Sequence, residues 1–491
     1  WALVSANKDF AAKTHAAVSL QQIVDTADHK RILRGNMNST ETAGSGGTHT
    51  RFFALKILKE VNQDGKYANI ALKENLRGEF FSERDVAFLT QLVYGTLERQ
   101  ITIDIFLKRF ASFKRVNPWI MNILRLGAYQ ILYLDRVPDS AACNEAVNQC
   151  GMHGLFALKG FVNGILRNVS RNKDKLLLPD KNLSLSANLS LQYSYPKWLI
   201  EKWIGDYGTE MTETILKPSD RGDALVIRVN TMKILPAALK EEFIRSGLEV
   251  LDGYHLKEDL RIAGAGDIQA NPFYREGYFT VQGESSMLDA YIMDPQPGET
   301  ILDACSSPGN KAIQIAERMG EKGQVIAWDI HEHRVALTER NRKRMDARIV
   351  LPSVRDASNP YPEFYEKFDR VLVDAPCSGL GVLHKKPDIK QKVRPEGLSE
   401  LSKLQEGILD ACSRYVKPDG ILVYSTCTIN PQENENMIQK LLAKRWDFVL
   451  DYPSPYLPDT LKSAVRDRMI QLIPSRDHMD GFFIARLRRK N

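Results

Sequence analysis

Two cysteines follow neighbouring predicted strands in surroundings that suit catalysis. Cys377 lies in DAPCSG after the apolar run RVLV, and Cys427 lies in STCT after GILVY, 50 residues later. Proline, serine, threonine and glycine flank both residues, whereas a cysteine of the core has apolar neighbours. A thiolate in an accessible loop is a strong nucleophile. The pattern indicates nucleophilic catalysis by one of the two thiols and leaves open which one.

A second group of residues predicts a ligand site. The segment DACSSPGNK, from Asp303 to Lys311, joins a predicted strand to a helix, and its glycine turn lets backbone N–H groups approach a ligand. Asp329 ends the next predicted strand, at a spacing that suits an acid bound to ribose hydroxyls. The same turn also occurs as a plain connection, and a lysine at a helix start is commonly a solvated residue.

Together these groups suit methylation of carbon 5 of cytosine. That carbon is too weak a nucleophile to take a methyl group from a sulfonium, but addition of a thiolate at carbon 6 converts the ring to an enamine. An acid hydrogen-bonded to ring N3 stabilises the adduct, and a base then removes the C5 proton so that the thiolate leaves. The cytosine must leave any base stack to be reached.

The elements that position these residues are predicted over residues 280–491. Strands and helices alternate from Gly283 onward, which is typical of a doubly wound, Rossmann-like α/β domain with ligands at the carboxyl ends of its strands. The predicted strands are ETILDAC, QVIAWDI, RIVLPSV, RVLVDAP and GILVYSTCT, with a final pair around MIQLIP and GFFIARL.

Four segments precede this domain. Residues 1–50 are predicted to be a leader or linker of doubtful status, and we expect Met37, ahead of a Ser/Thr/Gly stretch, to be the natural start. Residues 51–171 carry apolar residues at three- and four-residue spacing, which predicts an all-α domain. Residues 172–190 are polar and predict a linker, and residues 191–279 predict a small α+β unit.

The charge of the chain concentrates in the predicted helical domain. The whole chain has 67 Lys and Arg against 61 Asp and Glu, far from the dense positive field of a histone-like protein. Residues 51–171 hold 17 basic and 11 acidic side chains, which equals the entire net charge of +6. Such an excess is typical of a solvated helical face, and it also suits an RNA-docking surface.

Cysteine usage and hydropathy predict a cytoplasmic protein. The six cysteines form no CxxC pair and no cluster at zinc spacing, so neither a disulfide framework nor a metal site is expected. Cys143, Cys150 and Cys412 are predicted to be small buried hydrophobic residues. No run of 18 apolar residues exists, and charged residues interrupt the first 20 positions, so no membrane segment or signal peptide is predicted.

Four motifs resemble the S-adenosylmethionine-dependent RNA cytosine-5 methyltransferases: LDACSSPGNK, VLVDAPCSGLGVLHKKPDI, VYSTCTINPQENE and the terminal DGFFIARLRR. The helical start, with RFFALKIL, SERDVAFLTQLVYGTL and ILRLGAYQILYLDRVP, is similar to the NusB-like RNA-binding domain. In this order, over residues 51–491, both together resemble the Sun/RsmB-type family of bacterial 16S ribosomal RNA methyltransferases. The resemblance implies S-adenosylmethionine as cofactor, 16S ribosomal RNA as substrate and no obligate protein partner.

The resemblance also assigns roles to individual residues. Cys427 corresponds to the nucleophile, Cys377 to the second cysteine that assists product release, and Asp374 to the acid that holds the cytosine and borders the cofactor. Asp329 is placed at the ribose and Asp356, in SVRDAS, near the adenine. The loop that binds the methyl donor corresponds to Cys305, Ser306, Ser307, Pro308, Gly309, Asn310 and Lys311.

Three motifs depart from the family pattern. Asn310 stands where PGGK has its second glycine, and we expect its side chain to crowd the donor. Gly283 stands where VQDESS has an aspartate, and Ser306 and Ser307 replace the alanines of AAPG. Weaker cofactor binding is the expected effect, with activity retained.

Other functions share some of these features. A transfer RNA cytosine-5 methyltransferase uses the same chemistry, and a non-catalytic NusB-like assembly factor uses the helical domain alone. The two cysteines argue against the second, because a scaffold needs no reactive thiols. A DNA cytosine methyltransferase is disfavoured, since that family takes its nucleophile from a Pro-Cys motif and has a downstream Glu-Asn-Val that is absent here.

Four residues of the middle unit could bind RNA or serve the fold. Arg228 and Asn230, in the predicted strand RVNT, are candidates for RNA contact, and an ordinary exposed strand is an equal alternative. Trp198 and Trp203 are predicted to belong to a core rather than to stack on bases.

Overall fold

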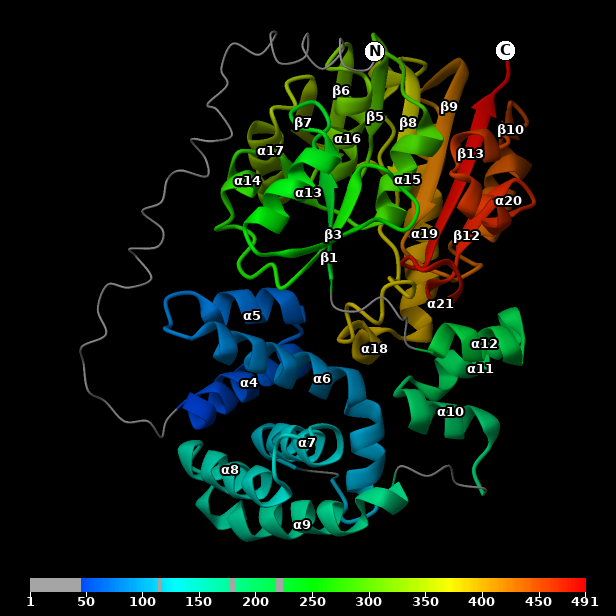
Figure 1. Cartoon of the computed structure of the whole chain (residues 1–491). Coiled ribbons are helices and arrows are strands. Elements are labelled where there is room, and N and C mark those ends of the chain that lie inside the picture. Colours follow the sequence, from blue (N-terminus) through cyan, green and yellow to red (C-terminus); the bar gives the residue numbers. More distant parts are fainter. Residues whose placement is uncertain (1–45, 114–115, 177–181, 218–223) are drawn as a thin grey trace.

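The computed structural model describes residues 46–113, 116–176, 182–217 and 224–491 (Figure 1). The predicted start at Met37 therefore lies outside the described residues. The predicted leader is wrong at its end, because residues 46–50 already form the first turns of a helix. Among the described residues, no helix is both long and apolar enough to cross a membrane.

The first domain is entirely helical, as predicted. Its core gathers apolar residues at helical spacing, such as Leu92, Leu97 and Leu124, all of them fully buried. Ser82 caps the long central helix by accepting a hydrogen bond from Asp85 N, and Pro118 opens the next helix. The helices are α4 (Gly46–Asn62), α5 (Ala68–Leu76), α6 (Glu83–Lys108), α7 (Pro118–Tyr133), α8 (Asp139–Met152), the 3₁₀ turn η1 (Phe156–Leu158) and α9 (Lys159–Leu176).

The segment 172–190, predicted to be a linker, is largely helical. Helix α9 runs to Leu176, and α10 (Leu185–Tyr193) begins after a cap by Ser184. Helix α10 packs on α6, where the Thr102 hydroxyl donates to Leu191 O at 2.7 Å. The polar composition of this segment reflects caps and exposed helix faces, and residues 177–181 lie outside the described part.

Two further helices pack on the last domain rather than on the sheet that follows them. They are α11 (Lys197–Tyr207) and α12 (Thr209–Leu216). Trp203 is fully buried in a cluster that includes Leu383 and Ile429 of the last domain, and Trp198 packs against the same cluster. The prediction of a core residue is confirmed for Trp203, and Trp198 is partly buried against the same core. The expected unit of residues 191–279 is therefore split between two packing clusters.

The middle sheet has four antiparallel strands in the order β2-β3-β1-β4. Apolar residues such as Ile227, Phe243 and Phe279 form its core. Its elements are β1 (Leu225–Val229), α13 (Pro236–Arg245), β2 (Glu249–Asp252), β3 (Asp259–Ala263), α14 (Pro272–Arg275) and β4 (Phe279–Val281).

The last domain is the predicted α/β domain, built on a sheet in the order β11-β12-β13-β9-β8-β5-β6-β7, with β10 paired to β13. Strands β5 to β9 are parallel and β13 runs antiparallel to β9. The strands are β5 (Thr300–Asp303), β6 (Gln324–Asp329), β7 (Val350–Val354), β8 (Phe368–Asp374), β9 (Val416–Thr426), β10 (Phe448–Leu450), β11 (Val465–Arg466), β12 (Met469–Leu472) and β13 (Phe482–Arg489). The strand order reverses between β5 and β8, and in such folds ligands bind outside the carboxyl ends of the strands at this point.

Helices cover both faces of this sheet (Figure 1). The helices of this domain are α15 (Glu284–Met293), α16 (Asn310–Arg318), α17 (Glu332–Met345), α18 (Ile389–Lys392), α19 (Pro395–Ser413), α20 (Glu435–Lys444) and α21 (Pro474–Asp477), with the 3₁₀ turns η2 (Pro362–Phe364), η3 (Ser454–Tyr456) and η4 (Asp459–Ala464).

Helix α18 lies where the helical domain meets the α/β domain (Figure 1). Lys392 Nζ donates to Lys66 O at 2.8 Å and lies 4.2 Å from the ring centroid of Tyr67. Lys390, which is 2% exposed, places Nζ 3.9 Å from the ring centroid of Tyr195. The Lys392 contacts therefore join the helical domain to the segment that follows the Cys377 loop in the chain.

Replacing Trp203 tests the packing of α11 on the α/β domain. We expect Trp203→Ala to lower the free energy of unfolding by about 3–5 kcal/mol, because the fully buried indole leaves a cavity between two elements. Urea unfolding followed by circular dichroism measures the change. Trp446→Ala is the control, since this side chain is 82% exposed and its loss should cost less than about 0.5 kcal/mol.

Candidate active site at the carboxyl ends of the parallel strands

The structure brings the predicted site residues to one edge of the sheet. The donor loop follows β5, Asp329 ends β6, and Asp356 follows β7. Asp374 ends β8, and the two cysteine loops follow β8 and β9. Arg355 N donates to Asp329 O at 3.1 Å, which ties the loops after β6 and β7 together. The proximity arises because the carboxyl ends of parallel strands meet at one edge.

The two thiols form a hydrogen-bonded pair. Cys377 Sγ and Cys427 Sγ are 3.1 Å apart. This bond lowers the pKa of Cys427, and the charges of Lys386 and Lys311 lower it further, against burial and Asp374. The same bond and burial raise the pKa of Cys377 well above its ordinary value. The two shifts favour ionisation at Cys427 over Cys377, a preference that spacing along the chain had left open.

A buried ammonium group lies beside the thiols. Lys311 Nζ forms ion pairs with Asp374 Oδ2, at 2.6 Å, and with Asp289. Ser425 Oγ donates to Asp289 Oδ2 at 3.0 Å and lies 3.3 Å from Asp374 Oδ1. Burial alone would lower the pKa of Lys311, but the two carboxylates raise it above its ordinary value. The alternative that Lys311 is a solvated residue is wrong.

Asp289 was missed by the sequence analysis. It lies on α15, is fully buried, and follows the apolar pair Met287 and Leu288. Burial raises the pKa of Asp289 to about 6, although Lys311 opposes the rise. A lone carboxylate among the buried apolar residues of a helix is the signal that could have identified it, because such a group needs a buried partner.

A buried acid lies at the base of the donor loop. Asp303 is fully buried, and apart from the neighbouring Ser306 no described residue hydrogen-bonds its carboxylate. Burial and the nearby Asp374 raise the pKa of Asp303 to about 7. Gly309 has a φ of 95°, and a Cβ there would lie 2.7 Å from Thr338 Cγ2. The loop therefore combines an unmatched buried acid with a turn that requires glycine.

The remaining loop residues line or brace this segment. Burial raises the pKa of the Cys305 thiol well above its ordinary value, so it is a neutral wall of the site. Ser307 Oγ donates to Arg334 O at 3.1 Å, and Asn341 Nδ2 donates to Pro308 O at 2.9 Å. Both contacts bind the loop to α17.

Asp329 and Asp356 differ in the partners of their carboxylates. Asp329, 5% exposed, accepts a hydrogen bond from His331 N at 3.1 Å and lies 3.4 Å from Arg334 Nε. Asp356 accepts from Ser358 Oγ at 2.6 Å and from Asn359 Nδ2 at 3.2 Å, so its carboxylate is held within its own turn.

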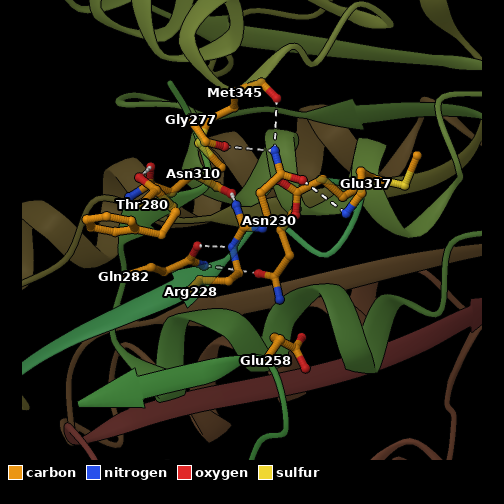
Figure 2. Close-up of polar contacts among 12 residues, drawn as sticks. Arg228, Asn230, Glu258, Gly277, Thr280, Gln282, Asn310, Glu317 and Met345 are labelled. Carbon is orange, nitrogen blue, oxygen red and sulfur yellow. Dashed lines mark hydrogen bonds and ion pairs between the residues drawn. The ribbon is translucent and has the colours of Figure 1, made fainter. Parts of the chain in front are cut away.

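Asn310 does not crowd the donor. It is the first residue of α16, while the positive φ belongs to Gly309. Its Nδ2 donates to Val281 O at 3.0 Å and its Oδ1 accepts from Thr280 Oγ1 at 3.3 Å, so the side chain turns toward β4 (Figure 2). The expectation of crowding is wrong, because the middle sheet offers polar partners on the other side of the helix.

Arg228 and Asn230 are buried, each only 1% exposed. They bond to the α/β domain rather than facing solvent (Figure 2). Contact with RNA and an ordinary exposed strand are therefore both wrong for these two side chains. Strand periodicity marks which side chains share a face, but it does not say that a second domain covers that face.

The other departure, Gly283, lies beside Asp480. A Cβ at this glycine would lie 3.1 Å from Asp480 Oδ2. Asp480 forms ion pairs with Lys385 Nζ at 2.8 Å and His384 Nε2 at 3.3 Å. A larger side chain at 283 would thus press on a carboxylate that anchors the loop after Cys377.

Glu433 fixes the two cysteine loops relative to each other. It is fully buried and accepts hydrogen bonds from Ser378 N at 2.9 Å and from Ser378 Oγ at 2.6 Å. Gln405 Nε2 and Asn430 Nδ2 each donate to it at 2.9 Å. Its place in the STCTINPQENE motif was visible in the sequence, but its partners come from distant segments.

Three family models match the chain in the order of its domains. They are the NusB family over residues 48–171, the ferredoxin-like domain of RsmF/B-like methyltransferases over 195–269, and the 16S rRNA methyltransferase RsmB/F over 290–488. The chain is 37% identical over 450 residues to the probable ribosomal RNA small subunit methyltransferase B of Bacillus subtilis (strain 168), covering 90% of this chain and 99% of that protein. The chain belongs to this methyltransferase family.

Other relatives agree with the family. The probable ribosomal RNA small subunit methyltransferase B of Synechocystis sp. (strain ATCC 27184 / PCC 6803 / Kazusa) is 35% identical, over 89% of this chain and 99% of that protein. The crystal structure of the protein PH0851 aligns with a TM-score of 0.75 at 26% identity, covering 91% of this chain and all of that one. The resemblance and the fold class are confirmed, and the chain is a methyltransferase rather than a non-catalytic scaffold.

The thiol pair makes a pH-dependent prediction. The hydrogen bond from Cys377 stabilises the Cys427 thiolate, so Cys377→Ala should raise the Cys427 pKa and move its reactivity to higher pH. Iodoacetamide labelling of the Cys427 peptide, measured by mass spectrometry across pH, reports the midpoint. Cys143→Ala, in the helical domain, should leave the midpoint unchanged. An unchanged or lower midpoint in Cys377→Ala would contradict the donor assignment.

Proposed function

We propose that the protein transfers a methyl group from S-adenosylmethionine to carbon 5 of one cytosine in 16S ribosomal RNA. The observation that carries the proposal is the pair of thiols: Cys427 Sγ lies 3.1 Å from Cys377 Sγ, beside the Lys311–Asp374 ion pair, and this contact lowers the pKa of Cys427. One activated nucleophile, a second thiol and a strand-end acid are the groups that this reaction needs.

Cys427 begins the reaction by adding to carbon 6 of the cytosine. The new S–C6 bond pushes the ring electrons toward carbon 5 and N3, which makes carbon 5 nucleophilic. Within the charge cluster, Asp289 is fully buried and Lys311 is 9% exposed, whereas the side chain of Asp374 is 29% exposed. Asp374 is thus the member that can hold the ring, and Lys311 fixes its orientation.

S-adenosylmethionine, when bound, supplies an electrophilic methyl group to carbon 5. The residues proposed to hold it are the loop from Cys305 to Lys311, Asp329 at the ribose and Asp356 near the adenine. The unmatched buried carboxylate of Asp303 suits the cationic amino acid end of such a ligand. Asp329 offers a nearly buried carboxylate to hydroxyl donors.

Cys377 acts when the product is released. A base removes the C5 proton, the C5–H electron pair restores the C5–C6 double bond, and the S–C6 bond breaks so that Cys427 leaves as a thiolate. The Cys377 thiol, 3.1 Å away, donates a hydrogen bond to the departing sulfur and lowers its cost of leaving.

The helical domain is proposed to dock the RNA. Its 17 basic and 11 acidic residues give a modest positive excess, and α18 joins it to the segment that follows the Cys377 loop. Binding should weaken modestly with salt, because few phosphates are neutralised. The family and the free thiols suit a reaction in the reducing cytoplasm. The same chemistry on transfer RNA is the second candidate.

Single cysteine variants separate the two roles. Cys427→Ala should reduce methyl transfer by about a thousandfold or more, because no nucleophile remains to activate the ring. Cys377→Ala should accumulate a covalent enzyme–RNA adduct, seen as a band that resists denaturing electrophoresis. Cys150→Ala, which changes a buried thiol in the helical domain, should behave like the wild type. Full turnover by Cys427→Ala would overturn the assignment.

Bisulfite sequencing identifies the substrate. Ribosomal and transfer RNA from cells with and without the gene are compared, and we expect one 16S position to lose 5-methylcytosine in the deletion. Complementation with the wild type should restore the mark, and complementation with Cys427→Ala should not. Loss of the mark at a transfer RNA position instead would favour the second candidate.

A further inference from the structure

We propose that Arg228 and Asn230 are positioning residues for the methyl donor: from the middle sheet they hold the two helices that flank the donor loop. The proposal rests on the proposed function, in which this loop binds S-adenosylmethionine. The side chains of both residues bond to α16 and α17 rather than to the thiols (Figure 2).

Arg228 reaches from β1 to both ends of α16. Its Nη1 forms an ion pair with Glu317 in the last turn, and its Nη2 lies 3.5 Å from Asn310 O in the first turn. Its Nε donates to Gln282 Oε1 at 2.8 Å. Burial raises the pKa of Glu317, and the guanidinium opposes that rise. One planar fork therefore joins the helix to β1 and to the residue that follows β4.

The partners of the middle sheet lie along one face of α16. Asn310, Gln314 and Glu317 follow the spacing of four and three residues that places side chains on the same side of a helix. Gln282 Nε2 donates to Gln314 Oε1 at 3.0 Å, and Asn310 bonds to β4. Lys311, one position further round, points to Asp289 and Asp374 instead. The first turn of α16 is therefore held by hydrogen bonds to the middle sheet on one side and by the ion pairs of Lys311 on the other.

Asn230 fastens the second helix. Its Nδ2 donates to Met345 O, the last residue of α17, at 3.0 Å, and to Gly277 O at 3.1 Å. A Cβ at Gly277 would lie 1.9 Å from Arg344 O, so the two backbones touch. Arg344 Nη1 in turn donates to Phe279 O at 2.9 Å.

Helix α17 transmits this anchorage to the donor loop. Its residues Arg334 and Asn341 bond to Ser307 and Pro308, and Thr338 packs against Gly309. With α16 starting at the end of the loop, both walls of the loop are therefore fixed by the middle sheet. Gly309 packs so closely against Thr338 that no Cβ would fit between them. A shift of either helix therefore changes the position of the loop.

Direct binding of S-adenosylmethionine to the full chain, without RNA, tests the proposal. Arg228→Lys keeps a positive charge for Glu317 but loses the fork to Gln282 and Asn310, and it should raise the dissociation constant measured by calorimetry by about tenfold. Turnover at saturating S-adenosylmethionine should stay within about twofold of the wild type. Asn310→Gly, which leaves the Arg228–Glu317 pair intact, should raise the constant by about two- to fivefold.

Two controls separate positioning from loss of stability. Ile262→Val loosens the core of the middle sheet away from α16, and Lys240→Ala removes a surface ion pair with Asp252. Ile262→Val should lower the unfolding temperature, and both should leave the dissociation constant unchanged. Unfolding temperatures of all variants are recorded without ligand.

The outcomes are distinct. The proposal is overturned if Arg228→Lys and Asn310→Gly bind S-adenosylmethionine as the wild type does, or if they lose RNA affinity alone. It is also overturned if Ile262→Val weakens donor binding as much as Arg228→Lys. If Arg228→Lys does not fold, Asn230→Ala decides, because it removes the hydrogen bond to Met345 O at the end of α17 and should also raise the dissociation constant. Failure of the wild type itself to bind S-adenosylmethionine would instead remove the proposed function.

Discussion

The buried ammonium of Lys311 is the interaction on which the site depends. It pairs with Asp289 on α15 and with Asp374 at the end of β8, while Ser425 on β9 contacts both carboxylates. An unpaired charge at this depth would cost several kcal/mol, so the elements that carry these groups are held together wherever the cluster forms. Cys427, the proposed nucleophile, follows β9 two residues after Ser425, and its place is set by the same constraint.

Two further buried polar groups hold the elements around this cluster. Glu433 joins the Cys377 loop to the Cys427 loop, and the Arg228–Glu317 pair joins α16 to the middle sheet. The Lys311 cluster and these further groups are buried, and each takes part in several hydrogen bonds or ion pairs. The geometry is therefore rigid, but it depends on every residue of these groups. Catalysis of this kind requires such rigidity, because the thiol, the ring and the methyl donor must meet within a narrow range of positions.

Much of the fold and of the site could be predicted from the sequence. Alternating apolar strands and helices identified the α/β domain, and motif positions brought Cys427, Cys377 and Asp374 to one edge. Predictions from local sequence pattern failed for residues whose position depends on packing between distant segments. Asp289 belongs to no recognised motif, although it pairs with Lys311. Arg228 has the sequence pattern of an exposed strand residue, although it is buried. Segment 172–190 has the composition of a linker, although α10 packs on α6.

The sequence by itself determined the chemistry: two thiols, a strand-end acid and a glycine turn whose residue types and order suit one reaction. Only the tertiary structure decided their electrostatic roles. Which thiol has the lower pKa depends on the 3.1 Å contact between segments 50 residues apart and on nearby lysines. Whether Asn310 faces the donor or β4 depends on a neighbouring sheet. Charge and hydrogen-bond direction act through space, and spacing along a chain does not record them.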